Sequence, residues 1–177
     1  VSEAARKMQQ TPVQSKPMTE DEILSEFWTQ TYQPKFAKAF AAGVRFAERH
    51  HGDGEIVSRR VEGDIHRYTY RDLAARARRM ANALAGLGVK PASRVGTMAW
   101  NGYRHLELYY SVSGSGAVLH TLNPRLHPDQ VVWIADHAED EVLFFDKTFL
   151  PLIESVASRL STVKHFVLMV DKGHMPE

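Results

Sequence analysis

From Arg94 onward, short apolar runs alternate with segments in which apolar residues recur every three or four positions. The extended runs begin at Arg94, Ala117, Val142 and Lys164. Helical periodicity between them predicts helices over residues 103–113, 128–137 and 149–160. Strands joined through helices are expected to pair in parallel, because a parallel pair needs a long crossover connection. The pattern therefore predicts an α/β fold with a doubly wound, mostly parallel sheet.

Upstream of this region the pattern predicts a β-hairpin and a long helix. Residues 55–60 and 64–70 are rich in β-branched and aromatic residues and flank a turn that contains Gly63. Thr69 and Asp72 have the spacing of a helix N-cap and its third residue. Gly86 and Gly88 are expected to end this helix. Its predicted buried face comprises Leu73, Ala77, Met80, Ala81, Leu84 and Leu87.

Residues 1–45 are predicted to form a polar tail and a helical extension. Residues 1–17 have no apolar periodicity, which predicts a mobile tail. Thr19 and Glu22 have capping-box spacing for a short helix. A second helix, over residues 34–50, places Phe36, Phe40, Val44 and Ala47 on one stripe. Core packing is the favoured interpretation of this stripe, and contact with a partner is the alternative.

Composition and charge exclude several classes of function. The chain has 177 residues, with 22 basic and 21 acidic ones, so its charge does not indicate a nucleic-acid or membrane-surface partner. The absence of cysteine excludes disulfides and thiolate sites. No apolar run has the roughly 20 residues that a membrane span needs. A cytoplasmic protein without a membrane span is the expectation.

Polar loops follow the four predicted parallel strands. In such sheets, ligands bind beyond the carboxyl ends of the strands. Asn123, Pro124 and Arg125 form one of these loops, in which Pro124 restricts the backbone and Pro128 starts the next helix. The alternative is that Asn123 and Pro124 make a simple turn and Arg125 is solvated. The four loops comprise residues 100–102, 123–125, 146–148 and 171–173.

Other candidate chemistry is weak. The Gly-Ser-Gly sequence at 114–116 follows a helix and precedes a strand, the reverse of a dinucleotide-binding turn, so helix capping is favoured. His127 and His137 lie at opposite ends of one predicted helix, about 15 Å apart, and are not expected to share a metal ion. The acidic run at 138–141 is predicted to be a solvated loop. Spacing alone identifies no catalytic constellation.

Two sequence stretches carry a family resemblance. They read "YTYRDL" from Tyr68 and "SGSGAVLHTLNPRLHPDQV" from Ser113. These are similar to the first two core motifs of AMP-forming acyl-CoA synthetases in the adenylate-forming superfamily. The likeness runs from about Phe46 to about Met175. Within the superfamily, the chain most resembles the fatty-acid ligases and the 3-(methylthio)propionyl-CoA ligases.

The resemblance implies a function for a longer protein. Such enzymes use ATP and Mg²⁺ to convert a carboxylic acid to an acyl-adenylate, and coenzyme A (CoA) then displaces AMP. The family's phosphate loop and its catalytic and magnesium-binding residues lie downstream of the stretch that ends at Glu177. Residues 46–177 are therefore expected to be the N-terminal part of the AMP-binding domain, truncated before the phosphate loop. The resemblance supplies no catalytic residue, and the isolated chain is predicted to be inactive.

The resemblance also suggests one part of a site. It places Asn123, Pro124 and Arg125 at the CoA entrance and Lys147 near the nucleotide end of CoA. It further implies a homodimer. The rival interpretation is a non-catalytic α/β binding or dimerisation module derived from the same family.

One departure from the family pattern concerns a turn. The family usually has Gly-Asp before the first sheet strand, whereas this chain has Ala92 and Ser93. A turn that commonly uses glycine is therefore expected to adopt an L-residue conformation here, at a cost in stability.

Overall fold

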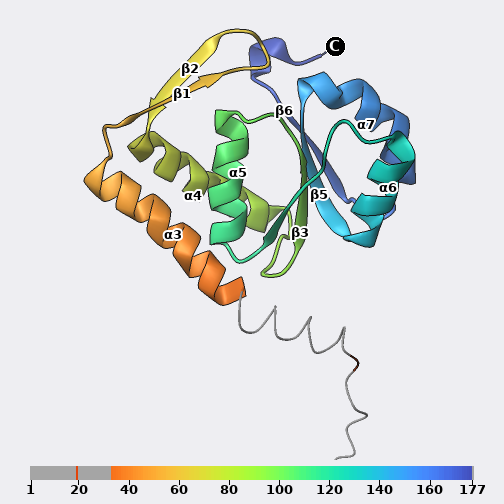
Figure 1. Cartoon of the computed structure of the whole chain (residues 1–177), viewed down its shortest axis with the longest axis horizontal. Helices are drawn as coiled ribbons and strands as arrows, with labels where there is room; N and C mark the ends of the chain where they lie inside the picture. Colours follow the sequence, from red (N-terminus) through yellow and green to blue (C-terminus); the bar gives the residue numbers. More distant parts are fainter. Residues whose placement is uncertain (1–18, 20–32, 177) are drawn as a thin grey trace, which may run out of the picture.

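The computed structural model describes residue 19 and residues 33–176 (Figure 1). The predicted tail and the short helix after Thr19 lie outside the described residues. The helices and strands are α3 (Gln33–His50), β1 (Glu55–Arg59), β2 (Ile65–Thr69), α4 (Tyr70–Gly86), β3 (Arg94–Met98), α5 (Tyr103–Gly114), β4 (Val118–Thr121), α6 (Pro128–His137), β5 (Asp140–Asp146), α7 (Leu150–Val156) and β6 (His165–Met169). Short 3-10 turns occupy Lys147–Phe149, Ala157–Arg159 and Lys172–His174.

Four strands form a parallel sheet in the order β4-β3-β5-β6. Helices α3, α4 and α5 lie on one side of this sheet, and α6 and α7 lie on the other (Figure 1). β3 and β5 are neighbours, although β4 separates them in the sequence, so the chain changes direction across the sheet between them. The predicted doubly wound, mostly parallel α/β fold is confirmed. So is the hairpin, in which β1 pairs antiparallel with β2.

The central strand β5 contributes to both faces of the sheet. Val142 and Phe144 pack in the core on the α5 side, and Leu143 and Phe145 pack in the core beneath α6 and α7. All four side chains are buried. A strand covered on both faces explains the continuous apolar run that predicted it.

The start of α4 has the predicted capping box. The Thr69 hydroxyl accepts a hydrogen bond from the Asp72 backbone N–H at 3.2 Å, and the Asp72 carboxylate accepts one from the Thr69 N–H at 3.0 Å. The helix ends at Gly86, and Gly88 has a φ of 85°. The prediction that Leu87 is buried was wrong: it is the C-cap, 36% exposed, and no longer follows the helical stripe.

Only part of the α3 stripe packs in the core, because Phe36 is 47% exposed and Ala47 is half-buried. Val44 is buried, and the ring of Phe40 contacts Tyr110 of α5 in an edge-on geometry at 6.0 Å. The predicted helix over residues 149–160 is interrupted instead. Only Leu150–Val156 is α-helical, and 3-10 turns precede and follow it.

The prediction of a solvated acidic loop at 138–141 was wrong for Asp140. This residue starts β5 and is fully buried. Its carboxylate lies 2.8 Å from Nδ1 of His120, and this hydrogen bond raises the pKa of His120. A Cβ atom on Gly96 would lie 2.8 Å from the same carboxylate, so the glycine leaves room for the pair. The hydrogen bond to His120 on β4 compensates the cost of burying the Asp140 carboxylate.

The turn before β3 does not adopt the expected L-residue conformation. Ala92 has a φ of 70°, a left-handed conformation that L-residues adopt at a cost. Ala92→Gly should therefore raise the free energy of unfolding by about 1 kcal/mol in urea denaturation. Ala83→Gly, at an exposed position inside α4, is the matched control and should lower it by about 1 kcal/mol. An Ala92→Gly variant less stable than the parent chain would contradict the strain.

Candidate functional site: the carboxyl edge of the sheet

Because the four strands are parallel, the loops that follow them lie at one edge of the sheet. The order of the loops along this carboxyl edge is the order of the strands, so the loop after β3 lies between those after β4 and β5. Neighbouring strands are about 5 Å apart, which places the Asn123–Arg125 loop and Lys147 about 10 Å apart at their strands. The structure thus brings all the predicted site residues to the same edge.

The loop after β4 is held in a fixed turn. Oδ1 of Asn123 accepts a hydrogen bond from the Arg125 backbone N–H at 3.0 Å. Directly afterwards, His127 caps α6, because its Nδ1 accepts a hydrogen bond from the Asp129 N–H at 3.3 Å. Both halves of the loop are anchored, as the simple-turn interpretation requires. The Arg125 guanidinium is exposed and has no hydrogen-bond or ion-pair partner among residues 33–176.

Lys147 begins the 3-10 turn after β5 and is also exposed. Its Nζ donates a hydrogen bond to the backbone carbonyl of His174 at 2.7 Å. The ammonium group has three donors, so two remain for another acceptor. Lys147 therefore fixes the segment after β6 and still presents positive charge at the carboxyl edge.

A hydrogen bond joins the loop after β3 to the end of β5. Asp146 is 6% exposed and accepts a hydrogen bond from the Trp100 backbone N–H at 2.7 Å. Burial raises the pKa of Asp146, and this hydrogen bond partly opposes the rise. The ring of Trp100 packs against Phe149 at 5.2 Å between centroids. Beneath the loop, buried His105 lies 3.1 Å from the Thr97 hydroxyl, and burial lowers the pKa of His105.

An ion-pair network joins the hairpin turn, the start of α5 and the segment after β6. Arg104 donates to both carboxylate oxygens of Glu62, at 2.9 and 3.2 Å, and to Asp171 at 2.8 Å. Arg60 pairs with Asp171 and Asp64. The Glu62 side chain is only 2% exposed and that of Arg104 is 13% exposed. Burial disfavours the charged Glu62, but the bonds from Arg104 prevail and lower its pKa.

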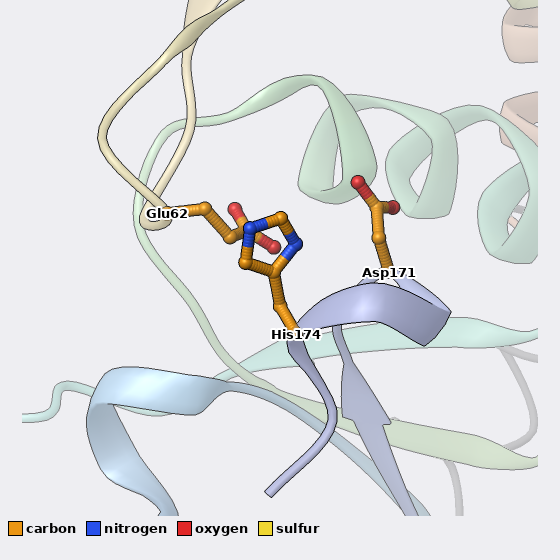
Figure 2. A group of neighbouring side chains, drawn as sticks. All are labelled: Glu62, Asp171 and His174. Carbon is orange, nitrogen blue, oxygen red and sulfur yellow. The ribbon is translucent and has the colours of Figure 1, made fainter.

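Three members of this region have metal-ligating side chains. Figure 2 shows Glu62 on the hairpin turn facing Asp171 and His174 of the C-terminal segment, and their ligand atoms lie within 4.8 Å of one another. Both carboxylates are already paired with the guanidiniums of Arg60 and Arg104, which would repel a cation. The cluster is therefore an ion-pair network and does not fit Mg²⁺ or another metal ion. The residues described in the structure contain no second cluster of this kind.

The network makes stability depend on pH in a defined direction. Hydrogen bonds from Arg104 hold the pKa of Asp171 below its usual range, and Glu62 is shifted the same way. Unfolded Asp and Glu titrate near about 3.9 and about 4.3. Their contribution is therefore fully present above these values and is lost as pH falls through the lower folded-state pKa values. Urea unfolding at pH 7, 5, 4 and 3 should show this loss, and Glu62→Gln should make it smaller. An identical pH dependence in the Glu62→Gln variant would contradict this role.

The two histidines considered for a metal site have other roles. His127 caps α6, and the ring of His137 stacks on Trp133 at 4.8 Å with an interplanar angle of 7°. Sequence reasoning missed the Glu62–Arg104 pair, because the partners lie 42 residues apart on different elements. Trp100 belongs to a loop that was predicted at the carboxyl edge of the sheet. A large aromatic residue directly after a strand could have indicated a role in contacting a ligand.

Within residues 33–176, none of the helices combines the length and apolar character needed to cross a membrane.

The structure is an α/β fold with a parallel sheet, and its polar loops lie at the carboxyl edge of that sheet. Residues 44–177 match the sequence profile of the family described as "AMP-binding enzyme". The chain belongs to this family.

Its relatives include several ligases. It is 55% identical over 126 residues to the 3-methylmercaptopropionyl-CoA ligase of Ruegeria lacuscaerulensis, covering 71% of this chain and 23% of the relative. It is 50% identical over 122 residues to the long-chain-fatty-acid–CoA ligase of Thermus thermophilus, covering 69% and 23%. The chain thus spans about a quarter of the length of the curated relatives it matches.

A solved structure supports the same grouping. The anthranilate CoA ligase AuaEII in complex with anthranoyl-AMP superimposes with a TM-score of 0.57 and 29% identity, over 59% of this chain and 20% of that one. A fatty acyl CoA synthetase from Mycobacterium tuberculosis is 23% identical, with a TM-score of 0.63 over 73% of this chain and 26% of the other, and shows the fold.

Proposed function

We propose that this chain is the N-terminal part of an ATP-dependent acyl-CoA synthetase. The whole enzyme would activate a fatty or a short- or medium-chain carboxylic acid with ATP and transfer it to CoA. The observation that carries this proposal is the sequence identity of 50% or more to two curated CoA ligases over more than 120 residues. The family match over residues 44–177 includes the segments that build the carboxyl edge.

Within that enzyme, we assign Asn123, Pro124, Arg125 and Lys147 to the CoA side. The exposed, unpaired guanidinium of Arg125 can donate two parallel hydrogen bonds to one phosphate group. Lys147 adds a second positive charge about two strand positions away. Asn123 and Pro124 hold the backbone that presents Arg125. These residues fit the phosphates of CoA, which supplies the thiol that accepts the acyl group.

The residues for ATP and Mg²⁺ are assigned to other parts of the whole enzyme. The chain has no G-x-x-x-x-G-K-[ST] sequence, and the carboxylate cluster in Figure 2 does not fit a cation. Purified 177-residue chain, incubated with ATP, Mg²⁺ and a carboxylic acid, should therefore release no acid-dependent pyrophosphate. Such release would show that the chain holds catalytic groups of its own.

The assignment of Arg125 is testable by direct binding. Arg125→Ala should weaken CoA binding to the chain about 10- to 150-fold, because one charge-assisted phosphate contact contributes about 1.5–3 kcal/mol. Isothermal titration calorimetry at low ionic strength measures this difference. Lys90→Ala removes an exposed charge before β3, at the opposite edge, and should leave the affinity unchanged. Equal CoA affinity of Arg125→Ala and the parent chain would rule out Arg125 as a CoA contact.

Three further features remain part of the proposal. Residues 1–45 and 46–177 are treated as an extension and the start of the AMP-binding domain, in agreement with the family match over residues 44–177. A homodimer and a cytoplasmic location are proposed from the family resemblance.

A further inference from the structure

Trp100 is an exposed aromatic residue between two cationic positions. It follows β3, which lies between β4 and β5 in the sheet, so the order along the carboxyl edge is Arg125, Trp100, Lys147. Its side chain is 44% exposed, although tryptophan usually buries most of its large apolar surface. The carboxyl edge therefore has an accessible aromatic ring with a positively charged residue on each side of it.

Trp100 has one backbone hydrogen bond and one ring contact to buried residues. The Trp100 backbone N–H donates to the buried carboxylate of Asp146 at 2.7 Å. Its ring contacts buried Phe149 at 5.2 Å with an interplanar angle of 40°, which supports it from the core side. One side of the ring therefore contacts the core, and the exposed part lies at the carboxyl edge.

The other described tryptophan differs in its surroundings. Trp133 is 65% exposed, but its ring stacks on His137 of the same helix at 4.8 Å. It lies on α6, which covers one face of the sheet (Figure 1). Trp100 is therefore the described tryptophan whose exposed ring is accompanied by cations that could bind phosphate.

We propose that Trp100 is a stacking platform for the purine base of an adenine nucleotide whose phosphates contact Arg125 and Lys147. A planar purine matches an exposed indole, and stacking of this kind needs no base-specific hydrogen bonds. This inference rests on the proposed function, because CoA carries an adenine nucleotide at one end. ATP carries the same base, so it is the other adenine nucleotide in the proposed reaction that could stack on Trp100.

The test uses tryptophan fluorescence of the 177-residue chain. Trp28→Phe and Trp133→Phe leave Trp100 as the only tryptophan, so quenching on stacking reports on this ring alone. The probes are adenosine 3′,5′-bisphosphate for the nucleotide end of CoA, ATP for the other source, and inorganic pyrophosphate as a base-free control. Saturable quenching by an adenosine probe, without quenching by pyrophosphate, is the expected result.

Calorimetry on the otherwise unmodified chain supplies the second readout. Trp100→Ala should weaken binding of the adenosine probe about 5- to 100-fold, and Trp100→Phe should retain most of the affinity because it keeps a stacking ring. Both variants are compared with the parent chain by urea unfolding, so that only folded protein is titrated. A Trp100→Ala variant that keeps full affinity, or a probe that binds without quenching, would overturn the stacking role.

The outcomes separate this inference from the proposed function. If Arg125→Ala weakens CoA binding but Trp100→Ala does not, the CoA side stands and the stacking role is wrong. If ATP quenches Trp100 and adenosine 3′,5′-bisphosphate does not bind, stacking is supported with ATP as its source and the CoA assignment fails. If no adenosine probe binds, both are wrong.

Discussion

Arg104→Ala is expected to lower the free energy of unfolding by about 3–5 kcal/mol, the cost of breaking a buried ion pair by removing one partner. Arg104 makes two hydrogen bonds to Glu62, whose side chain is 2% exposed, and a third to Asp171. Without the guanidinium, the Glu62 carboxylate stays buried with most of its compensating charge removed. Urea denaturation at pH 7 measures the loss.

A matched control separates burial from charge. The exposed pair Arg67–Glu55 also belongs to the hairpin, with side chains 59% and 51% exposed. Arg67→Ala should therefore cost less than about 1 kcal/mol. The double variant Glu62→Leu/Arg104→Met should lose less stability than Arg104→Ala, because no buried charge remains unpaired. Similar small losses in Arg104→Ala and Arg67→Ala would show that the network does not hold the hairpin.

Phe144→Ala is expected to cost about 3–5 kcal/mol, as truncation of a fully enclosed aromatic side chain usually does. Phe144 lies on β5, is 2% exposed and packs in the core on the α5 side. The strand is hydrogen-bonded to β3 and β6 on its two sides, so the surrounding structure has little room to close the cavity. The free energy of unfolding in urea is again the measurement.

Phe166 offers the comparison within the same pair of strands. It lies on the outer strand β6, opposite Leu143 of β5 in the register, and is 40% exposed. Phe166→Ala should cost about 1 kcal/mol or less, as exposed substitutions usually do. If the two substitutions cost the same, Phe144 would not be enclosed in the core on the α5 side of the sheet.

The main elements of the fold could be predicted because they depend on local patterns. Apolar runs separated by helical segments specify parallel strands, and the connection rules leave few alternatives for their arrangement. The α4 cap was predictable for the same reason, since Thr69 and Asp72 satisfy each other over three residues. The unusual turn at Ala92 was noticed only through the family resemblance, because the family usually has glycine there.

Features that depend on distant partners were not predictable. Asp140 looked like part of a solvated acidic run, because nothing nearby shows that His120 faces it across Gly96. Glu62 looked like a turn residue, and its burial depends on Arg104 of α5. In both cases a charged side chain is buried only because the fold brings an opposite charge to it.

The candidate site also has features that the sequence predicted and features that depend on distant partners. Its location followed from the rule that parallel strands end at one edge, and the structure places Arg125 and Lys147 there. The hydrogen bond from Lys147 to the His174 carbonyl depends on where the segment after β6 runs, which no sequence pattern specified. The exposure of Trp100 likewise depends on the packing of the loop against Asp146 and Phe149.

The most direct test of the account is a titration of ¹⁵N-labelled chain with CoA, followed residue by residue in amide NMR spectra. We predict that the shifts concentrate in residues 100–102, 123–125 and 147–148, at the carboxyl edge. The amides at the opposite edge, around Ala92 and Glu139, should remain unchanged. Shifts centred on that opposite edge, or no shifts at millimolar CoA, would contradict the proposal that this part of the enzyme contributes to CoA binding.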